Sequence, residues 1–118
     1  MTYVQGAVIP VKTNGKDAYL KAAKQMSVIF REYGALQTMD AWGIDVPDGV
    51  TTDFKKAVKA MPDETVVFSW MIWPDKATAE AAGQKMRTDA RMNPSAMPFD
   101  MKRMIFGGFE PLHEGGGR

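Results

Sequence analysis

Asp40 is the residue of this sequence best placed to do chemistry. Residues 35–46, ALQTMDAWGIDV, alternate as a strand, so that Asp40 shares a face with Leu36, Trp42 and Ile44. A carboxyl group on such an apolar face loses hydration and becomes able to exchange a proton near neutral pH. We therefore predict that Asp40 is a catalytic proton acceptor. The alternatives are a structural hydrogen bond, or a side chain that points outward past an irregularity in the strand.

Three further side chains are candidates for holding a ligand beside Asp40. Arg103 begins the predicted last strand, and its guanidinium group suits bidentate binding of a carboxylate. Trp42 and Trp70 could line a flat aromatic pocket, although tryptophans on strands also anchor cores and interfaces. We predict that Trp42, Trp70 and Arg103 bind a ligand, with packing and an ordinary ion pair as their alternative roles.

Other kinds of site have little support in the sequence. There is no cysteine, which excludes disulfides, thiolate nucleophiles and cysteine-bound metals, and the single histidine, His113, lies beside a Gly-rich tail. No phosphate-binding loop, dinucleotide fingerprint or hydrolase nucleophile motif occurs. We predict no metal and no cofactor.

Nucleic acid is not an expected partner. KRMIFGGF, residues 102–109, faintly resembles the aromatic-glycine strand of RNA-recognition domains, but that strand is the third in those domains and the last here. The formal net charge is only +1, and no basic cluster accompanies the motif. RNA binding is therefore the weakest of the functions considered.

Length and composition indicate one ordinary domain. The chain has 118 residues, of which 45% are hydrophobic and 25% charged. We expect a single domain over 1–112, with a short helical insertion at about 47–62, and a flexible tail over 113–118. Because no basic leader and no long apolar window is present, we expect a cytoplasmic protein with no membrane contact.

Periodicity and turn signals predict four strands and two main helices. Asn14 is placed to cap the first helix and Gly34 to end it, Thr51 or Thr52 to cap a short helix in the insertion, and Asp75 to cap the last helix. The predicted order is strand 3–11, helix to Gly34, strand 35–46, insertion 47–62, strand 64–74, helix to Asn93-Pro94, and strand 103–110. This order is typical of an α+β, ferredoxin-like βαββαβ fold with a four-stranded antiparallel sheet.

The residue pattern of the third predicted strand indicates that the protein associates with a second copy of itself. Residues 64–74 are apolar on both faces, with Val66, Phe68 and Trp70 on one face and Val67 and Trp73 on the other. Two helices cover only one face of such a sheet, so the second apolar face needs another cover. We predict a homodimer that closes into an α+β barrel. In the usual strand order Asp40 and Arg103 lie on opposite edges and do not touch within one chain.

Four stretches, in this order, resemble the YbaA-like family, also known as the domain of unknown function 1428 family: YGALQTMDAWGIDVPDG, TDFKKAVKA, ETVVFSWMIWP and MPFDMKRMIFGGFEPL. The resemblance extends from about Tyr3 to Leu112. It implies a dimeric α+β barrel, related in architecture to the antibiotic-biosynthesis monooxygenase and EthD-like proteins, and it implies no established activity. The sequence departs from the family pattern at Asp40, where glutamate is commoner, and at Met101, where glycine is commoner.

Two functions follow as hypotheses. The first is a small dimeric enzyme or binding protein that takes an apolar molecule with a carbonyl or phenol group into a barrel pocket, with Asp40 as the proton acceptor. The second is a noncatalytic dimer whose interior is packed with side chains. Ten methionines are many for this length; we expect them to fill irregular space in the core, although adaptable binding surfaces also use methionine.

Overall fold

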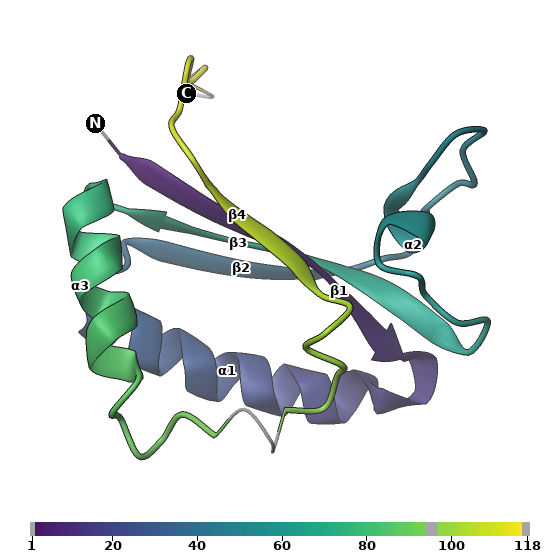
Figure 1. Ribbon diagram of the computed structural model, residues 1–118, viewed down its shortest axis with the longest axis horizontal. Coiled ribbons are helices and arrows are strands. Elements are labelled where there is room, and N and C mark those ends of the chain that lie inside the picture. The colour runs from purple at the N-terminus through teal and green to yellow at the C-terminus, as the bar shows by residue number, and fades with distance from the viewer. Residues whose placement is uncertain (1, 94–96, 117–118) are drawn as a thin grey trace.

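The computed structural model describes residues 2–93 and 97–116, and it contains one four-stranded antiparallel sheet in the order β2-β3-β1-β4 (Figure 1). The α+β, ferredoxin-like fold predicted from the sequence is confirmed. Strands β2 and β4 occupy opposite edges, as expected. The elements are β1 Tyr3–Lys12, η1 Thr13–Gly15, α1 Lys16–Glu32, β2 Gln37–Trp42, α2 Phe54–Ala57, β3 Glu64–Trp73, α3 Lys76–Met86 and β4 Ile105–Phe109.

The sheet carries α1 and α3 on one face, and α2 lies on the other side of the sheet, beyond one end of the strands (Figure 1). We call the face under α1 and α3 the helix face and the other the open face. Among the described residues, none of the helices combines the length and apolar character needed to cross a membrane. The predicted tail 113–118 is described only as far as residue 116.

Two separate clusters form the core on the helix face. At one end of the sheet, Tyr19 of α1 packs with Ile9, Val11 and Val67, all less than 10% exposed. At the other end, Trp73 is fully buried against Ala35, Ala79 and Ala82, so the small residues of α3 allow close approach to the sheet. The side chain of Trp73 donates a hydrogen bond of 2.8 Å from Nε1 to Oε1 of Gln5.

β2 and β4 are shorter than predicted, whereas β1 extends one residue further, to Lys12. β2 ends at Trp42 rather than at residue 46, because the chain leaves the sheet after Gly43, whose N–H donates to the carbonyl of Val66 at 2.9 Å. β4 begins at Ile105, which is opposite Val8 and is the first residue to pair with β1. Arg103 therefore lies in the turn before β4 and does not begin the strand.

Two predicted helix caps and one helix end are wrong. Gly15 rather than Asn14 is the N-cap of α1, because Asn14 lies within the η1 turn. Asp53, not a threonine, caps α2 and accepts a hydrogen bond from the N–H of Lys56 at 2.6 Å, whereas Asp75 caps α3 as predicted. α3 ends at Met86; beyond it, backbone and side-chain bonds to Asp89 favour turns over a continued helix. Pro94, the predicted stop signal, lies outside the described residues.

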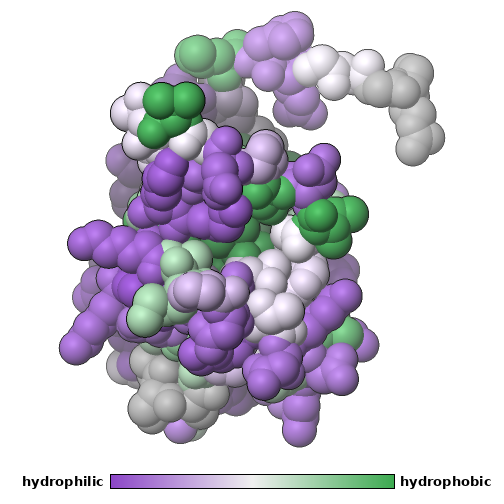
Figure 2. Space-filling model, turned by 90° about the vertical axis from the view of Figure 1, so that its right-hand side faces the viewer, coloured by the Kyte–Doolittle hydropathy of each residue, from purple (hydrophilic) through white to green (hydrophobic). Residues whose placement is uncertain are grey.

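The open face keeps large apolar side chains exposed. The α2 insertion covers one end of this face, where Val58 is buried with Val8 and Val66. Over the rest, the most exposed large apolar side chains are those of Met39, Phe68, Ile105 and Phe109. Seen from the end that bears α2, the surface is mainly hydrophilic, with hydrophobic side chains visible in a recess near its middle (Figure 2). The second apolar face predicted from the third strand is therefore left exposed in the single chain.

Gly34 is required by the turn that ends α1. Its φ is +114°, its N–H donates to the carbonyl of Arg31, and the next N–H, of Ala35, reaches back to Phe30 at 3.0 Å. This pattern is that of a helix end closed by a residue in the left-handed region, where glycine avoids the clash of a side chain. A Cβ atom at position 34 would also lie 2.8 Å from Cγ2 of Thr78.

We expect Gly34→Ala and Gly83→Ala to change stability in opposite directions. Gly34→Ala should lower the free energy of unfolding by about 1–3 kcal/mol, because alanine is strained at this φ. Gly83 lies inside α3, where nothing stands within 4 Å of an added Cβ, so Gly83→Ala should raise stability by up to about 1 kcal/mol. Urea denaturation measures both, and equal effects of the two variants would contradict this reading of Gly34.

Candidate functional site

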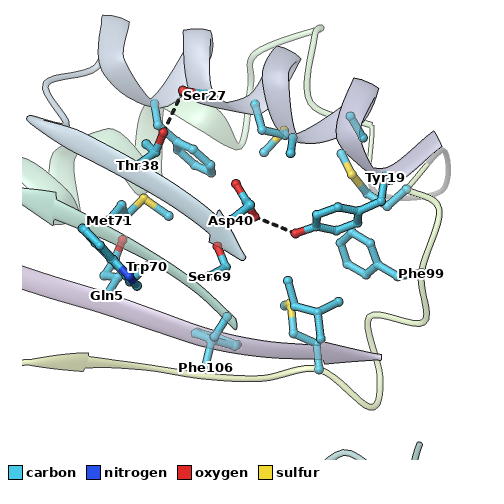
Figure 3. A pocket seen from close by; sticks show the side chains of 18 of the residues that line it. Gln5, Tyr19, Ser27, Thr38, Asp40, Ser69, Trp70, Met71, Phe99 and Phe106 are labelled. Atoms are coloured by element: carbon cyan, nitrogen blue, oxygen red, sulfur yellow. Dashed lines mark hydrogen bonds between the residues drawn. The ribbon is translucent and has the colours of Figure 1, made fainter. Parts of the chain in front are cut away.

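A pocket of about 380 Å³ lies between α1 and the helix face of the sheet (Figure 3). We call it the α1–sheet pocket. Its third wall is the connection between α3 and β4, which contributes Met92, Met97, Phe99, Met101 and Met104. The volume falls within the range of small-molecule sites in proteins. The pocket belongs to a single chain and lies under a helix, whereas the sequence predicted a pocket in a barrel interior.

The pocket exists because small side chains face each other across the gap between helix and sheet. Ala22 and Ala23 occupy the middle of the α1 inner face, and Ala7 and Ser69 lie on the sheet. At its two ends α1 is fastened to the two core clusters, through Tyr19 at one end and Phe30 and Tyr33 at the other. Side chains at the ends thus hold the helix above a middle section that alanines cannot fill.

Asp40 and Tyr19 form the polar centre of the pocket. The hydroxyl of Tyr19 donates a hydrogen bond of 2.7 Å to Oδ1 of Asp40, and the two side chains point toward each other from α1 and β2 (Figure 3). Burial and this bond raise the pKa of Tyr19 well above its usual value, so that Tyr19 stays protonated as the donor. Asp40 accepts no other hydrogen bond within residues 2–93 and 97–116, and its side chain is exposed in the single chain and lines the pocket.

The other polar groups of the pocket are mostly paired with one another. The hydroxyls of Ser27 and Thr38 lie 2.7 Å apart and join α1 to β2, and Gln5 accepts from Trp73. Ser69 is directly opposite Asp40 in the β2–β3 pairing, and its hydroxyl has no hydrogen bond to any other residue that the structure describes. A molecule in the pocket would therefore meet an acceptor oxygen of Asp40 with the Ser69 hydroxyl beside it.

Methionines supply much of the apolar lining. Met26 of α1, Met71 of β3 and four residues of the third wall line the pocket, which accounts for six of the ten methionines in the chain. Unbranched thioether side chains repack easily and make favourable contacts with aromatic rings. The sequence predicted core filling for the methionines, whereas these six line a pocket.

The structure separates the four predicted site residues. Asp40 lines the pocket as proposed. Trp70 also belongs to the lining, although alternation along β3 directs its side chain to the open face with Phe68. Trp42 packs at the edge of the Tyr19 cluster with Nζ of Lys16 5.7 Å from its ring centroid, and it is not part of the lining. Arg103 also lies outside the pocket and does not contact Asp40.

Arg103 instead joins three parts of the chain. Its guanidinium group donates two hydrogen bonds of 2.7 Å to the carboxylate of Glu64, one of 2.9 Å to Asp100 and one of 2.9 Å to the carbonyl of Lys59. We call this set the Arg103 clamp. It links the turn before β4 to the start of β3 and to the end of the α2 insertion. The Glu64 side chain is only 5% exposed, so an unpaired carboxylate there would be costly.

Sequence reasoning missed Tyr19 as a site residue. A signal was present: a buried tyrosine needs a partner for its hydroxyl, and Asp40 is on the strand face that looks toward this helix. The third wall gave no comparable signal, because it has no regular repeat. Within the described ranges, no cluster of three or more His, Asp or Glu side chains could hold a metal ion.

The fold and the site together define a small ferredoxin-like α+β protein with an apolar pocket beneath its first helix. Residues 2–101 match the family model described as protein of unknown function DUF1428, and the chain belongs to this family. The uncharacterised protein YbaA of Escherichia coli strain K12 is 50% identical over 114 residues, covering 95% of this chain and 97% of that protein, and YbaA of Shigella flexneri matches equally.

Two solved structures share the fold at low sequence identity. One is a dimeric ferredoxin-like protein from an uncultured marine organism, with a TM-score of 0.57 and 10% identity, covering 92% of this chain and 91% of the other. The second is a protein from Nitrosomonas europaea provisionally named an antibiotic biosynthesis monooxygenase, with a TM-score of 0.52 and 15% identity, covering 98% and 94% of the two chains. At these identities the likeness shows the fold alone.

We expect Arg103→Met to lower the free energy of unfolding by about 2–3 kcal/mol, because it leaves the carboxylate of Glu64 without its partner. Lys12→Met is the matched control: it breaks the Lys12–Asp63 pair, whose side chains are 58% and 64% exposed, and should change stability by no more than about 0.5 kcal/mol. Equal effects of the two variants in urea denaturation would show that the clamp is not a stabilising element.

The loss of stability expected in Arg103→Met should depend on pH. Hydrogen bonds from Arg103 are the main cause that lowers the pKa of Glu64 from 4.5 to about 2. The stabilisation is therefore complete above pH 4.5 and is lost as the pH falls toward 2. The stability difference between the wild-type protein and Arg103→Met should shrink over this range, whereas a constant difference would argue against the ion pair as its source.

Proposed function

We propose that this protein is a homodimer that binds a small, mainly apolar molecule in the α1–sheet pocket of each chain. A proton-bearing group of that molecule, such as a phenol or an enolisable carbonyl compound, lies at Asp40, which acts as hydrogen-bond and proton acceptor. The observation that carries this proposal is the Tyr19–Asp40 pair, placed in an otherwise apolar pocket. Tyr19 positions the carboxylate, and Trp70 contributes to the lining.

The free acceptor at Asp40 favours binding over simple packing. A noncatalytic dimer with a filled interior was the alternative, and it would require the carboxylate to have all its partners within the protein. Among the residues that the structure describes, Asp40 instead has one hydrogen-bond partner, Tyr19, and it borders unfilled volume. A ligand O–H placed there would complete the hydrogen bonds of the carboxylate without breaking any existing one.

The proposed dimer forms through the open faces of the two sheets. Its support is the set of exposed apolar side chains that neither α1 nor α3 can reach, which includes Met39, Phe68 and Phe109. The marine structure with the same fold is of a dimeric ferredoxin-like protein, which supports a dimer without indicating which face forms the interface. Because the pocket lies on the helix face, association through the open face leaves it intact in both copies.

The pocket is tested with 2-naphthol, a small apolar phenol, by isothermal titration calorimetry. We expect binding by the wild-type protein and a loss of affinity of at least about tenfold in Asp40→Asn, which keeps an acceptor for Tyr19 but removes the charge. Ala22→Leu should abolish binding without loss of stability, because it fills the middle of the pocket. Undiminished affinity in both variants would refute the proposed site.

The dimer is tested by sedimentation velocity of the wild-type protein and of Phe68→Glu. Phe68 is 47% exposed on the central strand β3, and a charge there should convert the dimer to a monomer. The control is Val28→Glu: Val28 is 57% exposed on α1, away from the open face, and the variant should remain dimeric. A monomeric wild-type protein, or two variants that behave alike, would contradict the interface.

A further inference from the structure

The α1–sheet pocket contains one formal charge and nothing that balances it. Among the described residues that line it, Asp40 is the only carboxylate, and no lysine, arginine or histidine takes part. Lys16, on the same helix as Tyr19, directs its ammonium group over the ring of Trp42, outside the lining. Tyr19 supplies a neutral hydrogen bond to the carboxylate, but no charge.

From this imbalance we infer that, among small apolar molecules with a donor group for Asp40, the pocket prefers an organic cation, that is, a protonated amine attached to a hydrophobic body. The inference rests on the proposed function, namely that the pocket binds a small molecule at Asp40. The ammonium N–H would donate to the carboxylate oxygen that Tyr19 leaves free, and the hydrophobic body would lie among the methionines. No covalent step is involved.

Desolvation explains why a cation is favoured over a neutral molecule of the same shape. Asp40 is exposed and lines the pocket, so water can reach its carboxylate when no ligand is bound. A ligand that fills the pocket excludes this water, and a carboxylate deprived of water without a counter-charge is destabilised. A neutral alcohol replaces one hydrogen bond, whereas an ammonium group also neutralises the charge. A carboxylate or phosphate ligand would add repulsion.

The aromatic lining also suits a cation. The rings of Tyr19 and Phe99 lie 5.9 Å apart in a tilted arrangement beside Asp40, and Phe106 approaches the same space from β4 (Figure 3). The faces of aromatic rings attract ammonium groups, most strongly where water is excluded. The sulfur atoms of the surrounding methionines are polarisable and tolerate ligands of different shape.

The experiment compares three probes that share one ring system and differ in charge at pH 7: 2-naphthylmethylamine, 2-naphthylmethanol and 2-naphthoate. Dissociation constants are measured by isothermal titration calorimetry with the wild-type protein, Asp40→Asn and Ala22→Leu. We expect the amine to bind at least about tenfold more tightly than the alcohol, and the naphthoate to bind most weakly. In Asp40→Asn the advantage of the amine should disappear, and Ala22→Leu should bind none of the three.

The outcomes distinguish this inference from the proposed function. If the alcohol binds as tightly as the amine, and both need Asp40 and an unfilled pocket, the cation preference is wrong while the binding site stands. If no probe shows binding that Ala22→Leu abolishes, both proposals fail. Preferential binding of naphthoate would overturn the charge argument directly, as would an amine preference that persists in Asp40→Asn.

Discussion

The hydrogen bond between Tyr19 and Asp40 joins the first helix to an edge strand and places a carboxylate in the wall of the α1–sheet pocket. Because α1 is fastened to a core cluster at each end, the helix spans the sheet without filling the space beneath its middle. Tyr19 belongs to one of these clusters and also orients the carboxylate. Stability and the candidate chemistry therefore depend on the same side chain, and the pocket is a consequence of where the large residues lie.

The two faces of the sheet differ in structure. The helix face contains the pocket, while the open face exposes apolar side chains that suit a second copy. The Arg103 clamp fixes the turn that leads from the third wall of the pocket into β4, and it does so from outside the pocket. Arg103, which the sequence predicted to bind a ligand, thus stabilises the junction between the pocket wall and the sheet.

Periodicity predicted the fold well, because the strands and the helices α1 and α3 are long enough to show their repeats. It predicted the contents of the site only in part. The face of Asp40 followed from alternation, but the partners of Arg103 did not, since Glu64 is 39 residues away and meets it only through strand order. Trp42 was placed on the correct face and still lies outside the pocket, because its position along β2 brings it to the Tyr19 cluster. The third wall was unpredictable because its methionines follow no repeat.

The account is tested most directly by methyl NMR of protein labelled with ¹³C at its methionine methyl groups, titrated with 2-naphthylmethylamine. The methionines divide between the two faces, since Met26, Met71 and Met101 line the pocket while Met39 lies on the open face. We predict that the probe shifts the signals of the pocket methionines and leaves that of Met39 unchanged. Shifts concentrated at Met39, with the pocket signals unmoved, would place the binding surface on the open face and contradict the account.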